Sequence, residues 1–191
     1  MRKIETREET EKRQTRNKVI IAVIFIGLMV LSTAGFALFS GNGITKKSSK
    51  TYNDVEFKTN DNGYWEFKIQ GQSFQTSFTP EETESISADA ISISEFSGKP
   101  IYFVNSDPAS ANEILYNMGR YATRYQDVCL KDLNCTNPDN IVKTCDDNLI
   151  VFKESDEDSV KRDNNCLFIN YSPGNEVLVG NRLIFKALGV Q

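Results

Sequence analysis

The chain has 191 residues, a net charge of −4 and no histidine. The missing histidine excludes the usual serine and cysteine hydrolases, which need a histidine base, and every zinc site with a histidine ligand. The acidic balance argues against nucleic-acid binding, and the sequence contains no glycine-rich phosphate-binding motif.

Residues 19–39 form an uncharged apolar stretch that separates a short tail, residues 1–18, from the rest of the chain. A helix of these 21 residues is about 31 Å long, close to the ~30 Å hydrocarbon thickness of a bilayer. We therefore expect a single-pass transmembrane helix that contacts the lipid bilayer. Gly35 and Ala37 fit a signal-peptide cleavage site, but the stretch is longer than the apolar core of a signal peptide, which favours an uncleaved signal anchor.

The charges on the two sides of this stretch predict its orientation. The tail carries seven basic and four acidic side chains, so its net charge is +3 and the remainder of the chain has −7. Three basic residues, Lys46, Lys47 and Lys50, closely follow the stretch, against the seven of the tail. By the positive-inside rule, we expect a cytoplasmic N-terminal tail and a C-terminal domain outside the cell membrane.

Residues 40–51 are rich in Gly, Ser and Lys and predict a flexible linker, so that an extracytoplasmic domain spans residues 52–191. Apolar and polar residues then alternate over residues 52–79, which predicts an antiparallel β-meander. We expect Trp65 to be a core residue of this meander rather than a ligand platform. The alternating apolar positions include Val55, Phe57, Trp65, Phe67, Ile69, Phe74 and Phe78.

The middle of the domain predicts strands followed by a long helix. A short strand is expected near residues 90–94, and the apolar run at residues 101–104 is typical of a buried strand. Asp107-Pro108 then provides a cap and a first-turn proline. Apolar residues at helical spacing continue from there to Cys129, which predicts one amphipathic helix of about twenty residues.

Further strands and a last helix complete the prediction. Buried strands are expected at residues 149–152 and 166–171, and the last helix begins near Asn175 and ends at Gly189. This order predicts an α+β domain in which two helices pack on a mixed sheet. Residues 101–104 should pair in parallel with residues 149–152, because the helix between them can serve as a right-handed crossover.

All four cysteines, Cys129, Cys135, Cys145 and Cys166, follow the apolar stretch. An even number of cysteines in an exported domain predicts two disulfide bonds. The gaps of five, nine and twenty residues do not match the closely spaced cysteine pairs of a zinc ribbon. Three connectivities are open, and we predict the most local one, Cys129–Cys135 with Cys145–Cys166.

The acidic residues of the domain do not form a recognisable metal site. Glu154, Asp156, Glu157 and Asp158 lie close together, but the glycine and the distal glutamate of an EF-hand loop are missing. We therefore expect a solvated loop there, and neither a metal ion nor a cofactor in the domain.

After the single N-terminal anchor, several residues and short segments follow one another along the outer domain in an order that allows comparison with known proteins. They are Phe57, Trp65, Gly71, residues 78–81, residues 121–129, Cys145, residues 148–151, residues 165–166 and residues 182–190. This order resembles a group of small membrane-anchored archaeal proteins with a four-cysteine extracytoplasmic domain and no characterised function. The resemblance covers most of the domain. It implies a location and a cysteine pattern, and no activity or catalytic residue.

Two classes of function remain open. The preferred one is a non-enzymatic, membrane-tethered envelope or interaction domain with a protein partner in the envelope, since no catalytic constellation is recognisable. The alternative is an extracytoplasmic enzyme that uses carboxylates, with Asp107, Glu113 and Asp146 as candidates. No spacing in the sequence favours these three residues over other acids.

Overall fold

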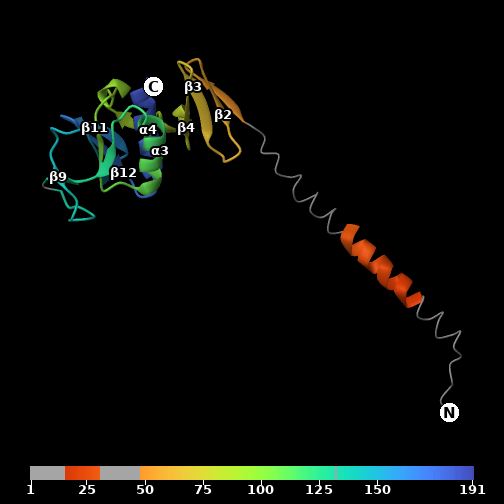
Figure 1. Cartoon of the computed structure of the whole chain (residues 1–191). Helices are drawn as coiled ribbons and strands as arrows, with labels where there is room; N and C mark the ends of the chain where they lie inside the picture. Colours follow the sequence, from red (N-terminus) through yellow and green to blue (C-terminus); the bar gives the residue numbers. More distant parts are fainter. Residues whose placement is uncertain (1–15, 31–47, 132) are drawn as a thin grey trace, which may run out of the picture. The chain divides into compact units, whose positions relative to one another are not determined.

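The structure is a computed structural model of the chain, and it describes residues 16–30, 48–131 and 133–191 (Figure 1). The chain separates into two compact units, residues 1–46 and residues 47–191. All strands that the structure describes lie in the second unit, together with helices, so this unit has the mixed α+β composition predicted from the sequence.

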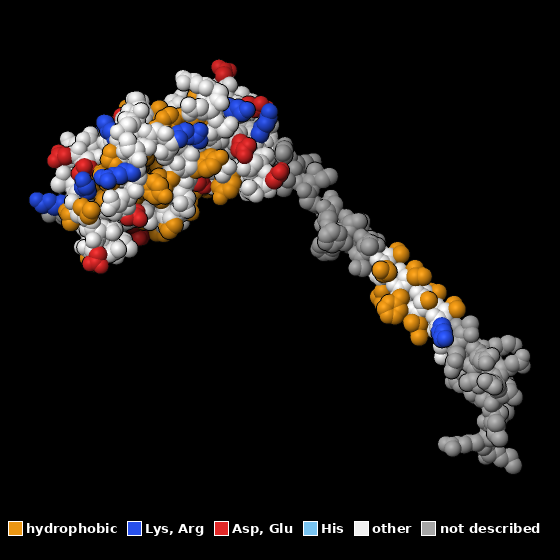
Figure 2. Space-filling view, viewed as in Figure 1, with side chains coloured by type: hydrophobic (Ala, Val, Ile, Leu, Met, Phe, Trp, Pro, Cys, Tyr) orange, Lys and Arg blue, Asp and Glu red, His pale blue; other side chains and the backbone are white. Residues whose placement is uncertain are grey.

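In the first unit, residues 16–30 form a helix whose large apolar side chains are 49% to 73% exposed. Figure 2 shows these side chains along the visible face of the helix. They are Val19, Ile20, Ile21, Val23, Ile24, Phe25, Ile26, Leu28, Met29 and Val30. No helix within the described residues has both the length and the hydropathy that a membrane crossing requires. The expected span at residues 19–39 lies outside the described residues from residue 31 onward, as do residues 1–15 of the tail and the linker through residue 47.

The second unit begins with the predicted meander. Four antiparallel strands pair in chain order: β1 (Ser49–Tyr52), β2 (Val55–Thr59), β3 (Trp65–Ile69) and β4 (Gln72–Thr76). Strand β1 lies partly in the stretch that was expected to be linker, because its backbone pairs with β2 from Ser49 onward. Trp65 is half-buried against the aromatic core of the meander, so it packs as predicted but at the margin of that core.

A six-stranded sheet forms the centre of the unit, in the order β5-β11-β12-β10-β6-β7. Strands β7, β6, β10 and β12 run parallel to one another, and β11 is antiparallel to β12. The predicted parallel pairing is confirmed, with Leu149 opposite Tyr102. The bounds are β5 (Ser87–Ala88), β6 (Ile101–Val104), β7 (Tyr125–Asp127), β10 (Leu149–Glu154), β11 (Ser159–Asp163) and β12 (Cys166–Tyr171).

Two helices, α3 (Pro108–Met118) and α4 (Glu176–Leu188), pack together on one face of this sheet (Figure 1). Ile114 and Met118 of α3 and Leu183 of α4 are buried against alternate residues of the strands. The helices approach each other at Gly180, where an added Cβ would lie 2.2 Å from Ser110 Oγ. Helix α4 ends as predicted at Gly189, which has a left-handed φ of 71°. A four-residue helix, α2 (Pro80–Thr83), contacts α4.

The opposite face of the sheet is covered by the segment that contains the cysteines. Tyr102, Val104 and Val151 alternate along the strands with the residues that face the helices. They form a second buried cluster with Val128 and Cys166. Successive strand residues point to opposite faces, so the two clusters lie on the two sides of the sheet. Two short paired strands, β8 (Cys129–Leu130) and β9 (Val142–Lys143), belong to the covering segment.

Two sequence predictions in this region are wrong. The helix of about twenty residues stops at Met118, and Tyr125 and Cys129 lie in strands β7 and β8. Helical spacing persists in the sequence there, but the backbone of β7 pairs with β6, and this non-local pairing prevails over the local pattern. The strand expected near residues 90–94 is replaced by a 3-10 turn, η1 (Ile93–Glu95), because Ser92 and Glu95 form a capping box.

Candidate functional site

A pocket lies at the carboxyl ends of strands β6 and β7 and extends along β7 to its first residue, Tyr125. The chain leaves β6 toward α3 on one face of the sheet, and it leaves β7 toward β8 on the other face. In open sheets with parallel strands, such a divergence of connections leaves a crevice where ligands bind. Here the crevice has a volume of about 420 Å³, within the range of small-molecule sites.

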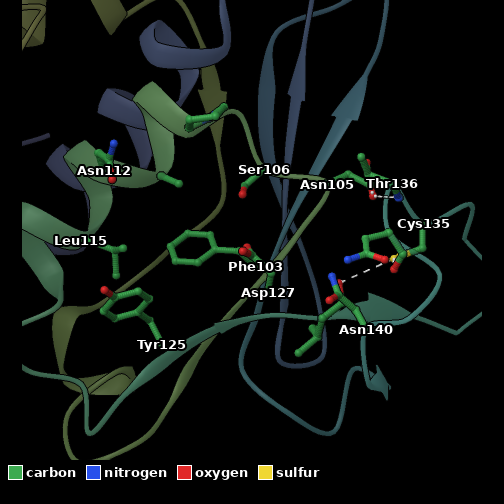
Figure 3. A pocket seen from close by; sticks show the side chains of 14 residues that line it. Phe103, Asn105, Ser106, Asn112, Leu115, Tyr125, Asp127, Cys135, Thr136 and Asn140 are labelled. Atoms are coloured by element: carbon green, nitrogen blue, oxygen red, sulfur yellow. Dashed lines mark hydrogen bonds between the residues drawn. The ribbon is translucent and has the colours of Figure 1, made fainter.

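The floor of the pocket is apolar. Phe103, Ala111 and Val128 are buried, and Leu115 is half-buried beside them. Figure 3 shows Phe103 between two walls. One wall carries Asn112, Leu115 and Tyr125, and the other carries Cys135, Thr136 and Asn140. The two walls therefore come from α3 with β7 and from the cysteine-containing segment.

Asn105 joins the second wall to the end of β6. Its Oδ1 accepts hydrogen bonds from the backbone N and the Oγ1 of Thr136, both at 2.9 Å, and its Nδ2 donates to the Asn134 carbonyl at 2.7 Å. Asn105 has a φ of 50°, in the left-handed region that asparagine tolerates better than most residues. This clamp fixes the loop around Cys135 over the carboxyl end of the sheet.

Two disulfide bonds hold the covering segment. They join Cys129 to Cys135 and Cys145 to Cys166, which is the pairing predicted from the sequence. The first closes the loop that carries the second pocket wall. The second ties the start of β12 to the segment before β10. Cys129 was expected at a helix end and lies instead in β8, so the short loop starts from a strand.

Five polar side chains that line the pocket are free to bind a ligand, and we call them the uncommitted side chains. Within the described residues, these side chains have no hydrogen-bond or ion-pair partner: Ser106, Asn112, Tyr125, Asp127 and Asn140. Tyr125 is 66% exposed. Hydroxyl, amide and carboxylate groups therefore face a hollow with an apolar floor. Such convergence of a few polar groups on an apolar cavity is typical of a binding site.

Acidic side chains surround Tyr171 at the carboxyl end of β12. Burial raises the pKa of the Tyr171 phenol, and the carboxylates of Glu176, Glu154 and Asp107 act in the same direction. Among the described residues that line the pocket, Asp127 carries a negative charge and none is Lys or Arg. The lining therefore offers no cationic side chain to a phosphate, sulfate or carboxylate ligand.

The three carboxylates considered as catalytic candidates lie in different places. Asp107 caps α3 and accepts a 2.8 Å hydrogen bond from Ser110 N. Glu113 accepts from Ser77 N at 3.0 Å and from Asn181 Nδ2 at 2.7 Å, so it links the residue after β4 to α3 and α4. Asp146 accepts from Thr144 Oγ1 at 3.1 Å in the covering segment.

These roles are structural, and the part of the chain that the structure describes shows no hydrogen bond between the three. It also contains no group of acidic, Cys or His residues that could hold a metal ion. In the acidic run after β10, the Asp158 carboxylate instead accepts hydrogen bonds from Ser172 and Asn175 ahead of α4.

The pocket residues were not identified from the sequence. Tyr125 was expected on the buried face of the long helix, and no role was predicted for Asn112. One signal was available, because Asn105 and Ser106 directly follow a buried strand whose parallel partner was predicted. Comparisons of the chain with protein-family models, with curated proteins and with solved structures find no match.

Proposed function

We propose that this protein is a single-pass membrane protein whose C-terminal α+β domain lies outside the cell and binds a ligand of the envelope without converting it. The pocket between α3, β7 and the Cys129–Cys135 loop is the binding site. The observation that carries this proposal is the set of five uncommitted polar side chains around an apolar floor.

The membrane location is supported by the helix at residues 16–30. Its apolar residues are nearly consecutive, so they cover every side of the helix and not one stripe. A helix with this character belongs in a protein core or in a membrane. The proposed span continues to residue 39 and leaves the N-terminal tail in the cytoplasm, with the lipid bilayer as a partner. The same location is implied by the resemblance to small membrane-anchored archaeal proteins.

The extracytoplasmic location is supported by the two disulfide bonds. Disulfides form and persist in oxidising compartments and are rare in the cytosol of most organisms. Both bonds lie in the second unit. A binding role without catalysis is supported by the separate structural roles of Asp107, Glu113 and Asp146.

A fragment screen tests whether the pocket is the binding site. The full chain in lipid nanodiscs would be screened against neutral, anionic and cationic fragments by saturation-transfer NMR. Asn112 is exposed on α3 and lines the pocket, so the Asn112→Trp variant should fill the opening and abolish the signals. Tyr116→Trp, on the same helix but outside the lining, is the control and should retain them. Fragment binding that is unchanged in Asn112→Trp would show that the ligand site lies elsewhere.

A further inference from the structure

We infer that the ligand of this pocket is a neutral oligosaccharide. The inference rests on the proposed function and adds the chemical class of the ligand. It follows from three properties of the lining: its charge, the bifunctional nature of its polar groups, and its apolar floor with an exposed tyrosine.

The charge of the lining selects against anions. Asp127 is the charged residue among the described residues that line the pocket, and its carboxylate has no hydrogen-bonding partner among them. A carboxylate accepts hydrogen bonds at two oxygens and donates none when ionised. Two neighbouring hydroxyl groups of a sugar ring could donate to these two oxygens. An anionic ligand would instead meet an unpaired negative charge.

The other uncommitted groups both donate and accept hydrogen bonds. Asn112 and Asn140 each offer an amide with two N–H donors and a carbonyl acceptor, and the hydroxyls of Ser106 and Tyr125 also act in both directions. A sugar hydroxyl likewise donates one hydrogen bond and accepts others. The lining therefore matches a ligand that carries many hydroxyls, whereas an ammonium ligand can only donate and would leave the amide N–H groups without partners.

The floor supplies an apolar surface for the C–H face of a sugar ring. Phe103, Leu115 and Val128 line it, and the Tyr125 ring stands beside it with 66% of its surface exposed. An aromatic ring with a polar tip is suited to ligands that have both an apolar and a polar side. Burial of the C–H face of a sugar against the Tyr125 ring would strengthen binding beyond the hydrogen bonds from the two walls.

Binding of defined oligosaccharides to the full chain in nanodiscs tests the inference. The probes are maltotriose, cellotriose and chitotriose as neutral ligands, trigalacturonic acid as an anion and trilysine as a cation, each titrated calorimetrically. We expect saturable binding of at least one neutral trisaccharide. Loss of one good contact weakens binding about tenfold, so Asp127→Asn and Tyr125→Ala should each weaken it at least that much. Two controls should have no effect: Tyr116→Ala, which removes a tyrosine that is 54% exposed outside the pocket, and Asp156→Asn.

The other outcomes separate this inference from the proposed function. Binding of trilysine or trigalacturonic acid alone, weakened by the pocket variants, would overturn the carbohydrate assignment and leave the binding site in place. Neutral trisaccharide binding that is unchanged in both Asp127→Asn and Tyr125→Ala would also overturn it. If neither the trisaccharides nor the fragments bind in a manner sensitive to Asn112→Trp, both proposals fail.

Discussion

Replacing Phe185 with alanine is expected to lower the free energy of unfolding of the C-terminal unit by about 3–5 kcal/mol, the usual cost of truncating a buried phenylalanine. Phe185 is fully buried on α4. Its ring lies 6.1 Å from that of Phe57 and 5.8 Å from that of Phe67, between centroids. These contacts join the meander to the helical layer, so the cavity would open between two parts of the unit.

The measurement is urea unfolding of the full chain, followed by fluorescence of Trp65. Trp65 is the single tryptophan of the chain and lies in the meander, against the same aromatic cluster. Lys186→Ala changes the next position of α4, which is only half-buried, and should cost less than about 1 kcal/mol. A loss below 1 kcal/mol in Phe185→Ala would contradict the view that this cluster holds the meander to the sheet.

Removing the Cys145–Cys166 disulfide, with both residues changed to alanine, is expected to cost about 3.3 kcal/mol of unfolding free energy. This figure follows from the chain-entropy relation for a sequence separation of 21 residues. Stability is expected to fall mainly because the unfolded chain gains freedom. Cys166 is also fully buried in the cluster under the covering segment, so some packing would be lost as well.

The Cys129–Cys135 disulfide provides the matched control. Its separation of 6 residues predicts a cost of about 2.2 kcal/mol when both cysteines become alanine. Urea unfolding of the two double variants and the unchanged chain, all without reductant, gives the comparison. A cost for Cys145–Cys166 that is equal to or smaller than that for Cys129–Cys135 would contradict the expected dependence on loop length.

Local patterns in the sequence were sufficient for much of the fold. Strict alternation around Trp65 and Phe67 identified the meander, because one face of each strand is buried and the other is wet. The apolar runs at residues 101–104 and 149–152 identified the buried parallel strands, since both faces of a central strand are covered. Gly189 marked the end of the last helix because few other residues adopt its backbone conformation readily.

Non-local contacts decided the parts that could not be predicted. Tyr125 has the spacing of a helical residue, but pairing of β7 with β6 places it in an edge strand. The pocket is assembled from residues 103 to 140, and its second wall depends on the clamp from Asn105 to Thr136, 31 positions apart. The spacing of apolar residues in the sequence does not predict hydrogen bonds between residues so far apart. The candidate site could therefore be identified only from the structure, where the loop lies against the sheet.

The proposed location of the C-terminal domain outside the cell can be tested directly by a labelling experiment. Asp156 is exposed in the loop after β10, and Glu8 belongs to the N-terminal tail. The native cysteines are paired, so single Asp156→Cys and Glu8→Cys variants each introduce one reactive thiol. Intact cells would be treated with a membrane-impermeant maleimide. We expect labelling of Asp156→Cys in intact cells and of Glu8→Cys only after lysis. Labelling of Glu8→Cys in intact cells, with protection of Asp156→Cys, would contradict the proposed orientation.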